Sequence, residues 1–144
     1  MFERILVALD PSASNGSALR LAGGLARSTE AEVRIVHVVP SAVAGDTVVS
    51  LEDDTDGTAL LEDAVRELRN TGVKAEGRLV HGMTTAVPLL ISDAAKEFEA
   101  DLLVLSPHHR GSFAALLTPR VSDAVAHTSN IAVLLAPEGP ADHE

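Results

Sequence analysis

The chain has 144 residues, the size of one ordinary domain, which leaves no room for a second domain with its own core. Hydrophobic residues make up 46% and charged residues 22%, which excludes a disordered or collagen-like chain; with no cysteine, a disulfide, a thiolate zinc site and a cysteine nucleophile are excluded too. Lys and Arg total 11 against 21 Asp and Glu, and the resulting net charge of −10 argues against nucleic acid as a partner.

The N-terminal segment shows no sign of export. Glu3, Arg4 and Asp10 interrupt its apolar residues, so it lacks the apolar region of a signal peptide. No apolar run approaches the roughly 20 residues that are needed to cross a bilayer. We therefore expect a soluble cytoplasmic protein that binds no membrane and forms one domain over residues 1–144.

Short apolar runs alternate with helical patterns along the chain. The strands that these runs predict cover residues 5–9, 33–39, 73–80, 102–105 and 131–136. The helices predicted between them have apolar faces at 18–26, 61–68, 87–98 and 121–125. Residues 41–57 have no long period and carry acidic side chains at 52–56, so we predict a solvated loop with a little helix there. The tail, 138–144, is polar.

This alternation of strand and helix predicts an α/β fold, with a parallel sheet and helices on both faces. Ligands of such folds bind beyond the carboxyl ends of the strands, near the point where the strand order reverses. Two of these ends are Leu9, which precedes Asp10, and Leu105, which precedes Ser106. His37 lies inside a buried-strand pattern, which predicts a hydrogen-bonded core or rim histidine rather than a catalytic one.

Four segments carry a resemblance to a known family. They read ILVALDPSASNGSALRLAGGLA, VRIVHVV, HGMTTAVPLLISDAAKEFEADLLVLS and LLTPRVSDAVAHTSNIAVLLAP, in this order. Together they resemble the universal stress protein (UspA-like) family from Ile5 to Pro137. The resemblance implies a five-stranded parallel sheet in the order 3-2-1-4-5 with helices on both faces, a Rossmann-like fold of the adenine nucleotide alpha hydrolase-like type.

The resemblance also implies two subclasses, one that binds ATP and one that does not and acts as a regulatory dimer. The ATP-binding subclass has the pattern G-x2-G-x9-G-[ST] after the fourth strand, where glycines let the backbone approach phosphates and helix N-terminal amides hold the anion. This chain departs from the pattern at all four positions, with Ser106, His109, Pro119 and Arg120. His109 adds bulk beside the phosphates, and Pro119 lacks a backbone N–H.

Half of the family's nucleotide pocket is nevertheless retained. Asp10 stands where ATP-binding members place an aspartate near the ribose, and Val38 stands where they hold adenine through backbone atoms. Asp10 before Pro11 is equally suited to a simple strand-to-helix turn. The leading hypothesis is therefore a regulatory or binding protein of the subclass without ATP, which is not an enzyme and needs no cofactor.

A cationic cluster keeps nucleotide binding open as an alternative. His108, His109, Arg110 and Arg120 could hold the phosphates of ATP with Mg, or of AMP, through side chains instead of backbone amides. The simpler interpretation is a solvated loop in which Arg120 pairs with a surface carboxylate such as Asp123.

Two further kinds of site have little support in the sequence. Ser106, His109 and Asp10 could be combined into a hydrolytic triad acting slowly on a bound nucleotide, but no G-x-S-x-G elbow is present. The adjacent histidines 108 and 109 lack metal-ligand spacing, and the acidic segment lacks the pattern of a calcium loop. We expect neither hydrolysis nor a metal site.

The last strand points to a protein partner. It is uncharged and apolar at Ile131, Ala132, Val133, Leu134 and Leu135. In the family's order it lies at the sheet edge, where an exposed apolar strand favours aggregation unless it is covered. The family is similar in forming dimers through this strand. We expect a homodimer, with a heterodimer with a paralogue as a second possibility.

Overall fold

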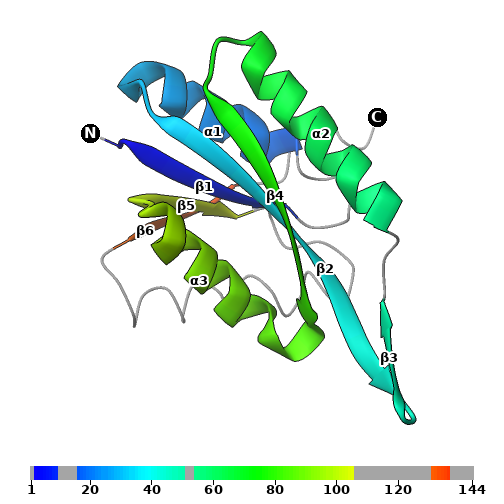
Figure 1. The fold of residues 1–144 in the computed structure, drawn as a ribbon. Helices are drawn as coiled ribbons and strands as arrows, with labels where there is room; N and C mark the ends of the chain where they lie inside the picture. Colours follow the sequence, from blue (N-terminus) through cyan, green and yellow to red (C-terminus); the bar gives the residue numbers. More distant parts are fainter. Residues whose placement is uncertain (1, 10–15, 51–53, 106–130, 137–144) are drawn as a thin grey trace.

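A computed structural model describes residues 2–9, 16–50, 54–105 and 131–136, and shows a central sheet between two layers of helices (Figure 1). The strands are β1 (Arg4–Leu9), β2 (Glu32–Ala44), β3 (Thr47–Ser50), β4 (Ala75–Met83), β5 (Leu102–Leu105) and β6 (Ala132–Leu135). The helices are α1 (Gly16–Thr29), α2 (Asp54–Asn70) and α3 (Val87–Phe98), and a short 3-10 turn (Thr84–Ala86) leads into α3.

Five of the strands pair in parallel, in the order β4-β2-β1-β5-β6. In chain order of the predicted strands this is 3-2-1-4-5, so the expected arrangement of the parallel strands is confirmed. In the described part of the chain β4 pairs only with β2 and β6 only with β5, which places these two strands at the sheet edges.

The sheet is nevertheless mixed rather than all parallel, because β3 is a sixth strand and runs antiparallel to the end of β2. The predicted loop over 41–57 is wrong over 41–50, which form this hairpin, whereas the little helix predicted there corresponds to the start of α2. Valines favour strand structure, and Gly45 adopts a φ of 66°, which a tight two-residue hairpin turn requires. The hairpin extends away from the body of the sheet (Figure 1).

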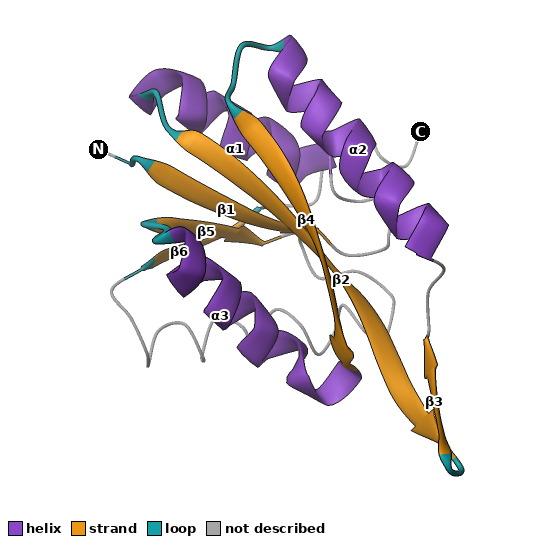
Figure 2. Ribbon diagram, in the orientation of Figure 1, coloured by secondary structure: helices purple, strands orange, loops and turns teal. Residues whose placement is uncertain are grey.

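Two apolar layers hold the helices to the sheet. Ile5, Val7 and Leu9 of β1 face α1 and α2, whereas Leu6 and Ala8 face α3. Figure 2 shows α1 and α2 on one side of the sheet and α3 on the other. Both faces of β1 are therefore buried, and this explains why its sequence is an uninterrupted apolar run.

None of the helices in the described residues is long and apolar enough to cross a membrane.

Candidate functional site

The strand order reverses between β1 and β5, and this is the point where ligands of doubly wound folds bind. From β1 the chain proceeds to β2 and β4 on one side, and later to β5 and β6 on the other. Ala8 is the register partner of Leu105, the last residue of β5. Leu9 and Leu105, which directly precede Asp10 and Ser106 in the sequence, thus end neighbouring strands at the same edge.

Val38 lies at this edge, one residue beyond His37, the last residue of β2 that is paired with β1. Its side chain is buried on the α3 side of the sheet, and its register partner in β4 is Val80. Beyond the end of β1, the pairing of β2 with β4 continues as far as Ser41 and Met83. β2 and β4 therefore extend beyond the end of β1, next to the point where the strand order reverses.

His37 lies in the interior of the protein, at the level where β1 ends. Its side chain is buried, and Nδ1 lies 3.2 Å from the carbonyl oxygen of Leu9. A Cβ atom at Gly57, in the first turns of α2, would lie 3.2 Å from His37 Cδ2, so α2 packs closely over the imidazole. The prediction of a hydrogen-bonded core histidine is confirmed.

Most of the predicted nucleotide-binding residues lie outside the described part of the chain. They are Asp10, Ser106, His109, Arg110, Pro119 and Arg120. Of the predicted set the structure describes Val38, at the carboxyl edge of the sheet. Within the described ranges, no group of three His, Asp or Glu side chains could hold a metal ion.

The predicted dimer strand is described in full. Ile131 directly precedes β6, which contains the other four residues, and β6 pairs only with β5 among the described strands. Ala132 and Leu135 are exposed, whereas Val133 and Leu134 are half-buried. The position of the strand at the sheet edge, which the family resemblance implied, is confirmed.

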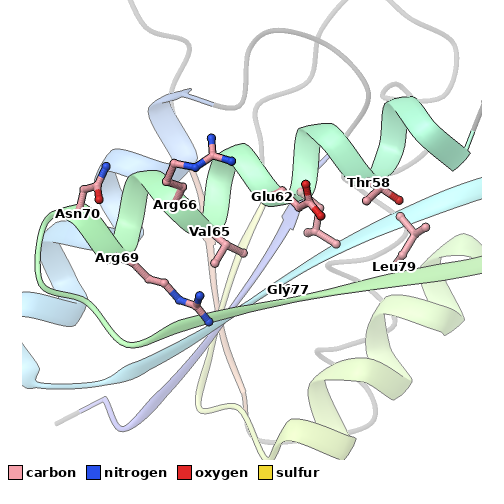
Figure 3. A pocket seen from close by; sticks show the side chains of 9 residues that line it. Thr58, Glu62, Val65, Arg66, Arg69, Asn70, Gly77 and Leu79 are labelled. Carbon is pink, nitrogen blue, oxygen red and sulfur yellow. The ribbon is translucent and has the colours of Figure 1, made fainter.

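A hollow lies away from the carboxyl edge, between α2 and β4, with a volume of about 570 Å³ (Figure 3). Its lining consists of Thr58, Leu61, Glu62, Val65, Arg66, Arg69, Asn70, Gly77 and Leu79. The α2 members recur three and four residues apart, so they form one stripe along the helix. Sequence reasoning missed this hollow, because the same spacing is typical of any helix that packs on a sheet.

The chain resembles proteins of a single family throughout its length. Residues 1–137 match the profile of the Universal stress protein family. Universal stress protein A homolog 1 of Coxiella burnetii is 27% identical over 138 residues, covering 92% of this chain and 94% of that protein. Universal stress protein YxiE of Bacillus subtilis is 29% identical over 151 residues, covering 94% and 99%.

Solved structures of proteins with the same family name have a similar fold. A universal stress protein from Archaeoglobus fulgidus has a TM-score of 0.70 and 27% identity, covering 95% of this chain and 100% of its own. The structure of an Archaeoglobus fulgidus universal stress protein in complex with dAMP has a TM-score of 0.68 at 27% identity, covering 94% and 98%. The sequence profile and the fold lead to one conclusion: this chain belongs to the universal stress protein family.

Proposed function

We propose that this protein is a regulatory or binding dimer of the universal stress protein family, of the subclass that does not bind ATP, and that it is not an enzyme. The observation that carries the proposal is the loss of the family's phosphate-binding pattern at Ser106, His109, Pro119 and Arg120. A proline has no N–H to donate to a phosphate, and neither serine nor histidine has the backbone freedom of glycine. ATP would therefore lose most of the backbone contacts to its phosphates.

The dimer part of the proposal rests on β6. In the described sheet this strand has a neighbour on one side only, and Leu135 at its end is 50% exposed. A net charge of −10 on each chain makes two copies repel each other. An uncharged edge strand is a place where two copies can approach, and a two-fold axis would pair it with itself.

A nucleotide-binding protein is the second proposal, and a specific observation favours it. The Archaeoglobus fulgidus relative in complex with dAMP is 27% identical to this chain. Asp10 and the backbone of Val38 would then hold the nucleoside, while Arg110, Arg120 and His109 would hold phosphate through side chains. ATP with Mg, or AMP, would be the ligand, and a slow hydrolysis of the bound nucleotide would depend on this second proposal.

The deciding experiment is mass spectrometry of any nucleotide that co-purifies with the protein, together with calorimetric titration of ATP·Mg. The leading proposal expects no co-purified nucleotide and no binding in the micromolar range. Micromolar binding by the unmodified protein would overturn it and support the second proposal.

Variants then distinguish a phosphate site built from backbone amides from one built from side chains. If the glycine pattern is what the chain has lost, the double substitution His109→Gly and Pro119→Gly is needed before ATP binds. If side chains hold the phosphates, Arg120→Ala abolishes binding in the unmodified background, and an unchanged affinity rejects that site. A turnover assay on His109→Ala tests hydrolysis, which requires that the substitution removes the activity.

A further inference from the structure

The hollow between α2 and β4 has an apolar floor and a charged end. Leu61, Val65 and Leu79 supply the apolar surface, and Gly77 of β4 exposes backbone between them. Glu62 and Thr58 line the part nearer the start of α2, whereas Arg69 and Asn70 line the part at its end. Leu61 and Arg69 lie about 12 Å apart along the helix axis, so the hollow is an elongated groove.

Arg69 is fixed across the charged end of this groove. Its Nε donates a hydrogen bond of 2.8 Å to the carbonyl oxygen of Ala75, the first residue of β4. Figure 3 shows its side chain extending from α2 toward β4, whereas Arg66 points away from the sheet. The bond to Ala75 uses one of five guanidinium N–H donors and leaves the terminal nitrogens available for an anion.

Other arginines of the described residues have carboxylate partners, in contrast to Arg69, and two of them face α3 on the other side of the sheet. Arg34 pairs with Glu76 at 2.7 Å, and Arg78 with Glu97 at 3.6 Å. Arg66, one turn before Arg69, pairs with Asp63 at 2.8 Å. No carboxylate within the described ranges forms an ion pair with Arg69. The hydrogen bond to Ala75 fixes the position of the guanidinium charge.

From this arrangement we propose that the α2–β4 groove binds a small amphiphilic carboxylate, with its carboxylate at Arg69 and its apolar body along Leu61, Val65 and Leu79. A planar guanidinium matches a carboxylate through two parallel hydrogen bonds. The groove volume falls within the range of known small-molecule sites.

The Arg69 end of this site lies far from the nucleotide pocket considered above, so the inference goes beyond the proposed function. Ala75, which anchors Arg69, pairs with Val33, whereas Val38 pairs with Val80. Ala75 and Val80 are about 17 Å apart along β4. The carboxylate end of the groove is therefore near the amino-terminal edge of the sheet, and a ligand there would not compete with a nucleotide at the carboxyl edge.

The test is a titration of the isotope-labelled full chain with octanoate, followed through its backbone amide signals. Octanol and acetate serve as matched probes, because one lacks the charge and the other lacks the apolar body. The proposal expects saturable shifts at Gly77 and at the α2 residues of the groove, and affinities for octanol and acetate that are weaker by about tenfold or more.

Two arginine variants, one in the groove and one outside it, give the matched comparison. Arg69→Gln should weaken octanoate binding about tenfold or more, because a charged hydrogen-bond partner is lost. Arg78→Gln should change it less than about twofold, since that side chain lies outside the groove lining and pairs with Glu97 of α3 on the other face of the sheet. Circular dichroism on both variants checks the fold, and the comparison of octanoate with octanol on the unmodified protein needs no variant at all.

Four outcomes would overturn the proposal. They are the absence of saturable shifts at millimolar octanoate, equal affinity for octanol, equal weakening by Arg78→Gln, and shifts as strong around the exposed Leu89 of α3 as in the groove. The last outcome would mean that octanoate coats apolar surface without a specific site.

Discussion

The imidazole Nδ1 of His37 donates a hydrogen bond of 3.2 Å to the carbonyl oxygen of Leu9, joining β2 to the last residue of β1. The bond is buried, and a carbonyl can only accept, so the proton is on Nδ1. The histidine thus helps to hold the end of β1 against the middle of β2, directly before Asp10 and Val38 in the sequence.

Replacing this histidine should destabilise the protein. His37→Ala leaves a cavity beside α2 and removes the buried hydrogen bond to the Leu9 carbonyl, and we expect a loss of about 2–4 kcal/mol in the free energy of unfolding. Urea denaturation measures it. His81→Ala is the control, because His81 is exposed on β4, and its effect should stay within about 0.5 kcal/mol. Equal effects of the two substitutions would contradict the role given to His37.

Two glycines should respond to alanine with opposite signs. A Cβ at Gly77 would lie 2.8 Å from Leu61 Cγ and 3.0 Å from Val65 Cγ2, so Gly77→Ala forces α2 away from β4. We expect a cost of about 1–3 kcal/mol. Gly24 lies within α1, and its added Cβ would meet only the end of the Arg27 side chain, at 4.0 Å.

Gly24→Ala should therefore stabilise the protein by about 0.5–1 kcal/mol, because alanine is the better helix former. Thermal unfolding should show a lower Tm for Gly77→Ala and a higher Tm for Gly24→Ala. A neutral Gly77→Ala would mean that α2 does not pack against β4 as tightly as described.

Arg34 should contribute more to stability than an ordinary surface arginine. Its side chain is only 15% exposed, its Nη2 lies 2.7 Å from Glu76 Oε2, and its guanidinium lies 4.5 Å from the ring centroid of Phe98. Arg34→Ala loses the ion pair and the contact with the ring, with an expected cost of about 1–2 kcal/mol. Arg34→Lys keeps the charge but not the planar group and should recover only part of this cost.

Arg66→Ala is the matched control for Arg34→Ala. Its pair with Asp63 is exposed at both partners, and such pairs contribute less than about 0.5 kcal/mol. Urea denaturation of the three arginine variants measures their free energies of unfolding. The prediction is wrong if Arg66→Ala lowers this free energy as much as Arg34→Ala does.

The proposed dimer predicts a change in mass on a single substitution. Leu135→Lys places a charge on the edge strand β6 and should convert the dimer to a monomer in light scattering coupled to gel filtration. Leu89→Lys is the control, because Leu89 is 59% exposed but lies on α3. A dimer that survives Leu135→Lys, or a monomer in the unmodified protein, would reject β6 as the interface.

The sequence already predicted much of the fold. Alternating apolar runs and helical patterns predicted the five parallel strands, and the order of those strands followed from the family resemblance. Ile5 and Leu6 face opposite layers and are both buried, which is why the run was uninterrupted. The buried state of His37 was predictable for the same reason, since it lies among apolar residues of β2.

The hairpin and the groove depended on contacts between distant parts of the chain. The run from Thr47 to Ser50 is flanked by acidic residues and is too short to be recognised as a strand from the sequence. Only its pairing with the end of β2 identifies it. The groove arises because α2 crosses β4 above Gly77, and Arg69 then reaches Ala75. Periodicity determines which face of a helix is apolar, whereas the space left between helix and strand is decided only when the two elements pack.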